Sequence, residues 1–223
     1  PFSKDIHAAS SNLILENSTK TCSISIKNNS YYTEINNIKN NENIILNIDY
    51  ILYISKIKLY NINAIALNFG PGNFTKLRLI SIISQNISLN KKNIIRISGI
   101  QNIAYATYNK YTYKHIIVAI KYRHNETFIC IYRHNTYRNI MQPIIPEKIK
   151  NISELLSFPN HYVYTGNMFS IINNIKKKYI LKSIYYRYPL IKYTSIISEK
   201  YLNNNLIAHM NNICPNYIIN NIF

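Results

Sequence analysis

The chain has little of several things that would direct a first interpretation. Only four glycines and no tryptophan occur among its 223 residues, and no apolar run approaches the ~20 residues that a membrane-spanning helix needs. The amino end, PFSKDIHAASSN, has neither the apolar stretch of a secretory signal nor the arginine-rich pattern of a transit peptide. We therefore expect a soluble, cytoplasmic protein with no membrane association.

Cysteine is scarce, and its placement argues against chemistry. Cys22, Cys130 and Cys214 are far apart, and the first two stand in alternating, strand-like sequence. A nucleophilic cysteine needs a nearby base and a metal site needs closely spaced ligands, and the sequence shows neither. His115, His124 and His134 lie on or near one hairpin without the HxxxH helix or the carboxylates of a metal site. We expect buried, reduced thiols, no metal, no cofactor and no catalytic residues.

Acidic residues are few as well, which leaves a strongly basic chain. Nine Asp and Glu face 26 Lys and Arg, for a formal charge of +17. Clustered cations gain affinity for nucleic acids by releasing counterions from phosphates. However, Ile, Asn and Lys dominate the composition, as in proteins of AT-biased genomes, so the charge alone does not identify an RNA-binding protein. The densest basic stretch, 175–179, is interpreted as the end of a solvated helix.

The hydrophobic pattern predicts an α/β protein with two lobes, each of which opens on antiparallel strands. In the first half we expect strands at 13–27, joined by a turn at 17–20, and at 30–35 and 64–68, with helices at 42–54 and 74–88. In the second half we expect strands at 93–97, 115–134 and 162–165, and helices from Gly99, at 167–179 and at 190–203.

Two of the four glycines, Gly70 and Gly72, bracket Pro71 between a predicted strand and a predicted helix. Glycine is required where a side chain would force a disallowed φ or block a close backbone approach. Asn73 then stands as a favoured helix N-cap. Such a turn can bind an anion, but GPGNFTK matches neither the phosphate-loop nor the dinucleotide pattern. A structural turn is the favoured interpretation.

The two helices that flank this strand predict a partner. The helix at 42–54 is apolar on nearly every side, and one sheet cannot cover all of them. On the helix at 74–88, Leu79, Ile80, Ile83 and Ile87 are expected to face the sheet, while a row of mainly small side chains is free for another helix. The predicted partner-binding residues are Ile44, Ile45, Ile48, Ile51, Leu52, Phe74, Leu77, Ser81, Ser84 and Ser88.

A family resemblance is carried by the same segment. GPGNFTKLR, residues 70–78, is similar to Gly-Pro-Gly-Ser-Phe-Thr-Gly-Leu-Arg of the TsaB family, with LENSTKTCSISI, SGIQNIAYA, AIKYRHNETF and PNYI in the matching order. The structural turn motif comprises Gly70, Pro71, Gly72, Asn73, Thr75 and Arg78, with Asn73 in the place of the family's Ser, and Arg123 and Glu126 match the family in the later hairpin. The chain departs from the family pattern at several positions. It has Glu16 and Asn17 where the family has Asp and Thr, and Lys121 and Tyr122 where the family has Asp and Ala. Lys76, Ile80 and Asn86 replace glycines, and Ile219 replaces an Arg.

The resemblance implies an actin-like, ribonuclease H-like fold and a non-catalytic scaffold role. The family pairs through its first two helices with the catalytic subunit TsaD, and the ATPase TsaE joins the complex. This complex transfers a threonylcarbamoyl group to the adenosine next to the anticodon of tRNA. Self-association through the same helices is a further expectation. Glu16 has no following glycine hairpin, so ATP binding by the chain alone is not expected.

Three questions stay open at this point. One alternative is a stand-alone actin-like ATPase or kinase, and another is a basic RNA-binding module. Arg123 and Glu126 suit either a structural role, which is favoured, or a partner contact. The expected domain division has three parts. They are an amino-terminal extension at 1–12, for which disorder is one interpretation, a first α/β lobe at 13–107 with the partner-binding helices, and a second α/β lobe at 108–223.

Overall fold

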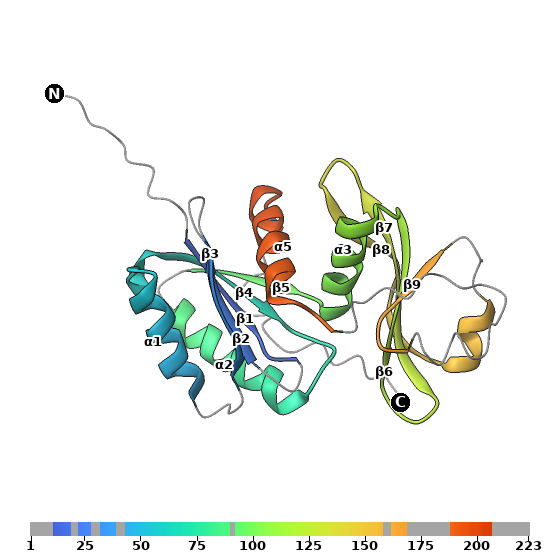
Figure 1. The fold of residues 1–223 in the computed structure, drawn as a ribbon, viewed down its shortest axis with the longest axis horizontal. Helices are drawn as coiled ribbons and strands as arrows, with labels where there is room; N and C mark the ends of the chain where they lie inside the picture. Colours follow the sequence, from blue (N-terminus) through green and yellow to red (C-terminus); the bar gives the residue numbers. More distant parts are fainter. Residues whose placement is uncertain are drawn as a thin grey trace.

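The computed structural model describes residues 11–18, 22–27, 32–38, 43–89, 92–157, 162–168 and 188–206. Two β-sheets with their helices form two lobes that lie side by side (Figure 1). The predicted two-lobed α/β fold is confirmed. None of the helices in these ranges is long and apolar enough to cross a membrane. The predicted helix at 167–179, the basic stretch within it and Cys214 lie largely or wholly outside the described residues.

The first sheet has the strand order β3-β2-β1-β4-β5. Its strands are β1 (Ser11–Glu16), β2 (Cys22–Lys27), β3 (Tyr32–Ile38), β4 (Ile62–Asn68) and β5 (Asn93–Ile97). The first three pair antiparallel, and β4 and β5 run parallel to β1, which is the ribonuclease H-like arrangement. Helices α1 (Ile44–Ile54) and α2 (Phe74–Ser88) cover one face (Figure 1). A short 3₁₀ helix, η2 (Leu59–Asn61), precedes β4.

The second sheet has the strand order β8-β7-β6-β9. Its strands are β6 (His115–Lys121), β7 (Glu126–Asn135), β8 (Ile140–Asn151) and β9 (Val163–Thr165), and the 3₁₀ helix η3 (Ile152–Ser157) follows β8. The helix α3 (Gly99–Tyr111) packs against β6, β7 and β8. The helix α5 (Ile191–Asn203) packs against β1, β2, β4 and β5, on the face opposite α1 and α2 (Figure 1). Cys22 and Cys130 are buried free thiols, as expected.

Two helices, α3 and α5, do not pack with the lobe that the expected division at 107/108 assigns to them. Most of α3 lies before that boundary, yet α3 packs on the second sheet, and α5 comes last in the described chain yet packs on the first. Asn102 joins the two helices, since its Nδ2 donates to the Leu190 carbonyl and to Thr194 Oγ1, both at 2.8 Å. One apolar core therefore continues from α5 through α3 into the second sheet.

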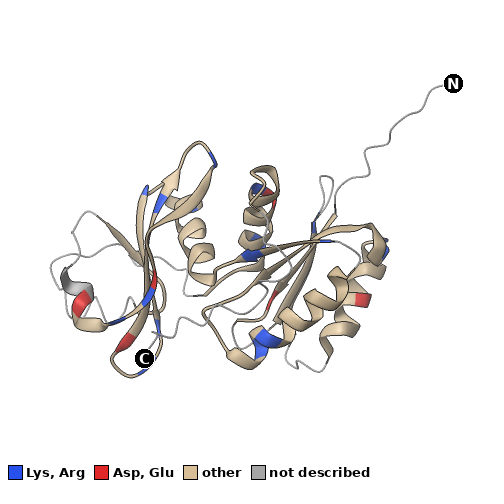
Figure 2. Ribbon diagram, turned by 180° about the vertical axis from the view of Figure 1, so that it is seen from behind, with Lys and Arg blue, Asp and Glu red and all other residues tan. Residues whose placement is uncertain are grey.

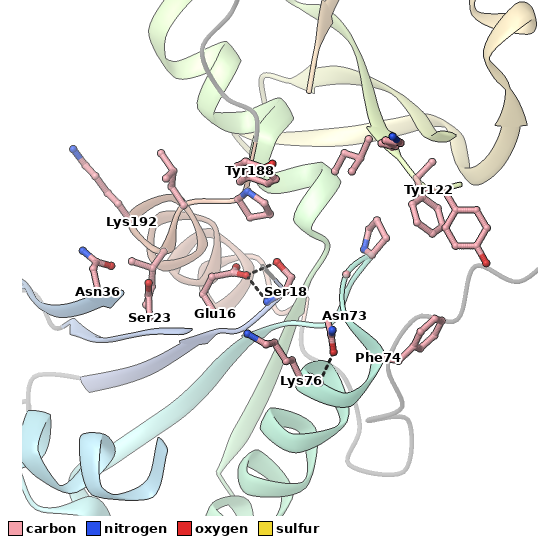
Figure 3. Close-up of a pocket in the computed structure, with 18 of the residues that line it drawn as sticks. Glu16, Ser18, Ser23, Asn36, Asn73, Phe74, Lys76, Tyr122, Tyr188 and Lys192 are labelled. Carbon is pink, nitrogen blue, oxygen red and sulfur yellow. Dashed lines mark hydrogen bonds between the residues drawn. The ribbon is translucent and has the colours of Figure 1, made fainter. Parts of the chain in front are cut away.

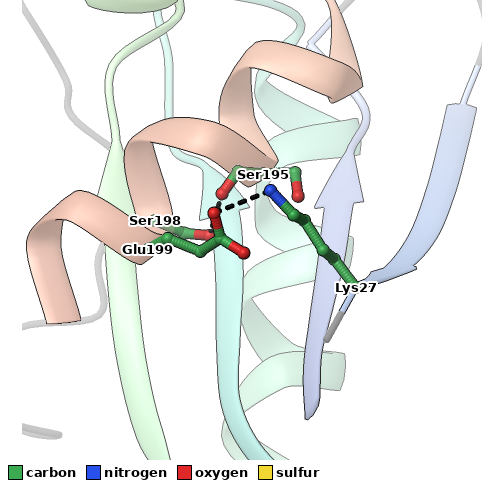
Figure 4. Close-up of polar contacts among 4 residues, drawn as sticks. All are labelled: Lys27, Ser195, Ser198 and Glu199. Carbon is green, nitrogen blue, oxygen red and sulfur yellow. Dashed lines mark hydrogen bonds and ion pairs between the residues drawn. The ribbon is translucent and has the colours of Figure 1, made fainter. Parts of the chain in front are cut away.

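Polar contacts also fasten α5 to the first sheet. Lys27 Nζ on β2 lies 2.7 Å from Glu199 Oε2 on α5, and Ser195 and Ser198 are buried beside this ion pair (Figure 4). At the same end of the sheet, where Asn12 pairs with Lys27, β1 begins at Ser11, whose backbone NH donates to Asn63 Oδ1 at 2.9 Å. The first sheet thus includes two residues, Ser11 and Asn12, that the sequence assigned to the amino-terminal extension.

Candidate functional site

The GPG turn connects β4 to α2 through two demanding backbone positions. Gly70 has φ +126°, a conformation that side chains disfavour. Gly72 packs so closely that a Cβ atom there would lie 2.6 Å from the Ser18 carbonyl oxygen. Asn73 caps α2 as predicted, because its side-chain oxygen accepts a hydrogen bond from the Lys76 NH at 3.2 Å. The matched residues Thr75 and Arg78 are exposed on the first turns of α2.

A buried carboxylate ties this turn to the β1–β2 loop. Glu16 Oε1 accepts hydrogen bonds from Ser18 Oγ at 2.6 Å and from the Ser18 NH at 3.1 Å. Asn68 Nδ2 donates to Glu16 Oε2 at 2.8 Å, and Asn68 Oδ1 accepts from the Gly70 NH at 3.0 Å. Burial raises the pKa of Glu16, and the hydrogen bonds from Ser18 and Asn68 oppose that rise. As site residues, the sequence predicted neither Ser18, although it lies in the matched segment LENSTKTCSISI, nor Asn68, which ends the strand before the GPG turn.

Glu16, Ser18 and the GPG turn form one wall of a cleft between the lobes, which has a volume of about 1240 Å³. Figure 3 shows side chains of both lobes around it, with Glu16, Lys76 and Phe74 on the first lobe and Tyr122 across the cleft. The segment that leads into α5 completes the lining with Tyr188, Pro189, Leu190, Ile191 and Lys192. We call this space the interlobe cleft.

The hairpin residues Arg123 and Glu126 lie at the turn between β6 and β7. Arg123 is exposed, and its guanidinium carbon lies 4.9 Å from the centre of the Tyr122 ring. Glu126 is half-buried at the start of β7, and its carbonyl accepts a hydrogen bond from the Tyr122 NH at 3.1 Å. No ion pair joins Arg123 to Glu126, both of which belong to the described part of the chain. Arg123 contacts its own hairpin, and the backbone of Glu126 also pairs with Asn151 of β8.

On α1 the structure separates the predicted partner-binding residues into two groups. Ile44, Ile48, Ile51 and Leu52 are at most 7% exposed, because their spacing turns them toward the first sheet, where they join its core. These four do not lie on a surface that a partner reaches, so the prediction was wrong for them. Ile45 is 62% exposed and does lie on the outer side.

The row of small residues on α2 corrects the sequence interpretation in the same way. Leu77, Ser81, Ser84 and Ser88 are buried with Ile80 and Ile83, on the side of α2 that faces β4 and β5. The small side chains let α2 approach its own sheet closely, and the hydroxyls of Ser81 and Ser88 donate to carbonyls of the helix itself at 2.8 Å. Of the predicted α2 contacts, only Phe74 is exposed, at 44%.

The outer sides of both helices nevertheless carry large apolar side chains. We call them the outer helical face, which comprises Ile45, Leu46, Tyr50, Tyr53 and Ile54 of α1 and Phe74, Ile82 and Leu89 of α2 and its carboxyl end, all between 41% and 80% exposed. Of these, the sequence predicted Ile45 and Phe74 as partner-binding residues, but not Leu46, Tyr50, Tyr53, Ile54, Ile82 or Leu89. The all-round apolarity of the segment 42–54 was a signal for those on α1, but only the packing shows which side remains uncovered.

The basic side chains of the described chain occur on both lobes. In Figure 2 the Lys and Arg positions are spread over both lobes, with few Asp and Glu between them. His134 stacks on Tyr108 with ring centres 3.7 Å apart, and His115 meets Tyr162 edge to face, so these two histidines have packing roles. The overall charge therefore singles out no site by itself.

Comparison with known proteins places the chain in a family. No family model matches it. It is 31% identical over 195 residues, which is 76% of this chain and 83% of the relative, to the tRNA threonylcarbamoyladenosine biosynthesis protein TsaB of Buchnera aphidicola from Acyrthosiphon pisum. It is 30% identical over 120 residues to TsaB of Haemophilus influenzae, which covers 52% of this chain and 51% of that protein.

A solved structure shows the same fold. The structure of YeaZ from Pseudomonas aeruginosa matches with a TM-score of 0.80 at 16% identity and covers 93% of this chain and 99% of that one. The sequence identity to TsaB proteins therefore points to the family that the motif GPGNFTKLR indicated, and the structural similarity to YeaZ agrees with the two-lobed fold. The chain belongs to the TsaB family.

Proposed function

We propose that this chain is a cytoplasmic, non-catalytic subunit of the machinery that makes threonylcarbamoyladenosine in tRNA. In this proposal it pairs through its outer helical face with a TsaD-like catalytic subunit, and a TsaE-like ATPase joins the complex. The relatives named tRNA threonylcarbamoyladenosine biosynthesis protein support the pathway. The observation that supports the pairing is the outer helical face.

Leu46 and Tyr53 illustrate why the outer helical face suits a partner. They are 65% and 80% exposed on α1, although a monomeric protein gains nothing from large apolar side chains in water. Aromatic and aliphatic anchors of this kind supply most of the affinity of protein interfaces. The buried side of α1 is already filled by the chain's own sheet, so the outer side is the surface available to a partner. A second copy of the chain is the competing occupant.

The geometry around Glu16 supports a non-catalytic role. A carboxylate that takes part in nucleotide chemistry must reach the ligand or its metal ion. Here Glu16 is 3% exposed, and both of its oxygens accept hydrogen bonds from Ser18 and Asn68. Gly72 rests against Ser18, so the turn backbone contacts protein where a phosphate-binding turn needs space. These side chains act as a structural tie between two loops.

The test is copurification of this chain with a TsaD-like subunit, using a matched pair of variants. Tyr53→Glu places a carboxylate in the outer helical face, while Tyr137→Glu makes the same change at a side chain that is 94% exposed in the β7–β8 turn. Burying an unpaired carboxylate at an interface weakens binding by at least about 30-fold. We expect Tyr53→Glu to abolish copurification and Tyr137→Glu to preserve it, with both variants folded.

Two outcomes would contradict the proposal. One is equal copurification of both variants, which would place the interface elsewhere. The other is threonylcarbamoyl transfer or ATP hydrolysis by the chain alone, which would show an enzyme. Sedimentation of the chain alone tests whether a second copy of the chain occupies the outer helical face. If it does, the parent chain should self-associate and Tyr53→Glu should not.

A further inference from the structure

The interlobe cleft brings three lysines together from separate elements. Lys76 comes from the first turn of α2, Lys121 from the end of β6 and Lys192 from the start of α5. Lys121 and Lys192 are exposed, and Lys76 is half-buried. Residues so distant in sequence line one cleft because the two lobes face each other here. The cleft therefore has cations on both lobes.

The acidic groups of the described cleft lining already have hydrogen-bond partners. Among the described residues that line the cleft, the carboxylates are Glu16 and Glu34. Glu16 is 3% exposed and its oxygens are occupied. Glu34 accepts hydrogen bonds from the Tyr32 hydroxyl and from Asn36 Nδ2, the latter at 2.7 Å. The cleft thus favours an anionic ligand.

Aromatic rings stand among the cations. Tyr188 is 56% and Phe74 44% exposed, and the half-buried Tyr122 packs against Phe128 with ring centres 4.6 Å apart. Figure 3 shows Phe74 and Tyr122 on opposite lobes, with Tyr188 beside the start of α5. Exposed rings beside lysines form the stacking surface and the charged track with which proteins bind single-stranded nucleic acid.

We propose that the interlobe cleft binds a single-stranded segment of RNA, with its phosphates on Lys76, Lys121 and Lys192 and its bases against Tyr122 and Tyr188. The volume of about 1240 Å³ exceeds the ~300–1,000 Å³ of sites that hold one small molecule, which favours a strand over a mononucleotide. The inference rests on the proposed function, since it gives this subunit its own contact with the tRNA.

The test measures binding of the purified full chain to a fluorescein-labelled RNA of about ten nucleotides, within the ~4–16 nucleotide range of single-strand sites. Lys121→Gln/Lys192→Gln removes two cleft cations, and the control Lys110→Gln/Lys114→Gln removes the same charge from exposed positions at the far end of α3, roughly 16 Å along its axis from Gly99. Each phosphate contact contributes about 0.7 to the salt slope.

The cleft variant should therefore bind roughly 25-fold more weakly at 0.1 M salt, with a slope smaller by about 1.4, while the control variant stays close to the parent chain. Tyr122→Ala should lower the affinity at least about fivefold, and Tyr122→Phe should restore it, because only the ring stacks. The four lysines are exposed, so the melting temperatures of the two lysine variants should remain unchanged and show that these variants fold.

Three results would overturn the inference. They are an equal loss of affinity in the two lysine variants, no RNA binding by the parent chain at low salt, and tighter binding of ADP than of RNA to the cleft. The copurification test separates this failure from failure of the proposed function. Lys121→Gln/Lys192→Gln should still copurify with the TsaD-like subunit, because neither lysine belongs to the outer helical face, which shares only Phe74 with the interlobe cleft.

Discussion

Replacing Gly72 with alanine is expected to destabilise this protein through one close contact. A Cβ atom at this position would lie 2.6 Å from the Ser18 carbonyl oxygen, 2.7 Å from its Cβ and 2.9 Å from its Cα. Ser18 cannot move away easily, since Glu16 holds its NH and its hydroxyl, and its carbonyl accepts the Asn73 NH at 3.3 Å. The added methyl group must therefore separate the turn from the β1–β2 loop.

The magnitude follows from two contributions. Overpacking a tight site costs about 1–3 kcal/mol, and loss of the hydrogen bond from Asn73 to Ser18 adds about 0.5–1.5 kcal/mol. The free energy of unfolding should fall by roughly 2–4 kcal/mol, which lowers the melting temperature by roughly 5–15 °C in a chain of this size. Urea unfolding followed by circular dichroism measures the first quantity, and thermal unfolding measures the second.

Thr75→Ala serves as the control, because Thr75 is exposed on the same helix and should change stability by less than about 0.5 kcal/mol. If Gly72→Ala unfolds at the same urea concentration as the parent chain, the turn has room for a side chain and the close approach is not the reason for glycine. A loss of partner binding without a loss of stability would instead assign Gly72 to an interface.

Other perturbations test the remaining contacts. Burial raises the pKa of Glu16 in the folded chain above its ordinary value of 4.5. The folded chain therefore binds the Glu16 proton more tightly than the unfolded chain does. The resulting stabilisation is complete below about pH 4.5 and is lost as the pH rises through the folded pKa. The stability of the parent chain relative to Glu16→Gln should therefore fall with rising pH, and a flat difference would refute this. Asn102→Ala removes three hydrogen bonds to the start of α5, including that from the Leu190 NH to Asn102 Oδ1 at 3.0 Å, and should cost about 2–3 kcal/mol in urea unfolding. Lys27→Ala should cost less than about 1 kcal/mol in the same assay, because the side chains of Lys27 and Glu199 are 24% and 32% exposed to solvent, and a larger loss would show a tighter ion pair than the geometry indicates.

Local features were predictable because their causes are local in sequence. The turn between β4 and α2 was recognised from two glycines around a proline, and the N-cap from Asn73 directly before the helix. The strands at either end of the polar turn 17–20 followed from alternation alone. In each case the physical rule involves residues a few positions apart, so no knowledge of the fold was needed.

The candidate sites were less predictable, because they depend on what covers each side chain. Ser81 and Ser84 suited a helix partner as well as a sheet, and only packing shows that the sheet takes them. Tyr53 and Ile51 are both apolar residues of one helix, yet one is 80% exposed and the other fully buried. A hydrophobic pattern says that a helix needs covering, but it does not say which side its own chain covers.

The sequence by itself determined the alternation of strands and helices, the need for glycine at the GPG turn and the family to which the chain belongs, since these depend on short motifs and on periodicity. Only the tertiary structure decided that α3 and α5 cross between the lobes, that Glu16 is a buried tie rather than an open carboxylate, and that lysines from α2, β6 and α5 meet in one cleft. Those arrangements join residues far apart in the chain, and long-range contacts are settled by how whole faces pack together rather than by any local preference.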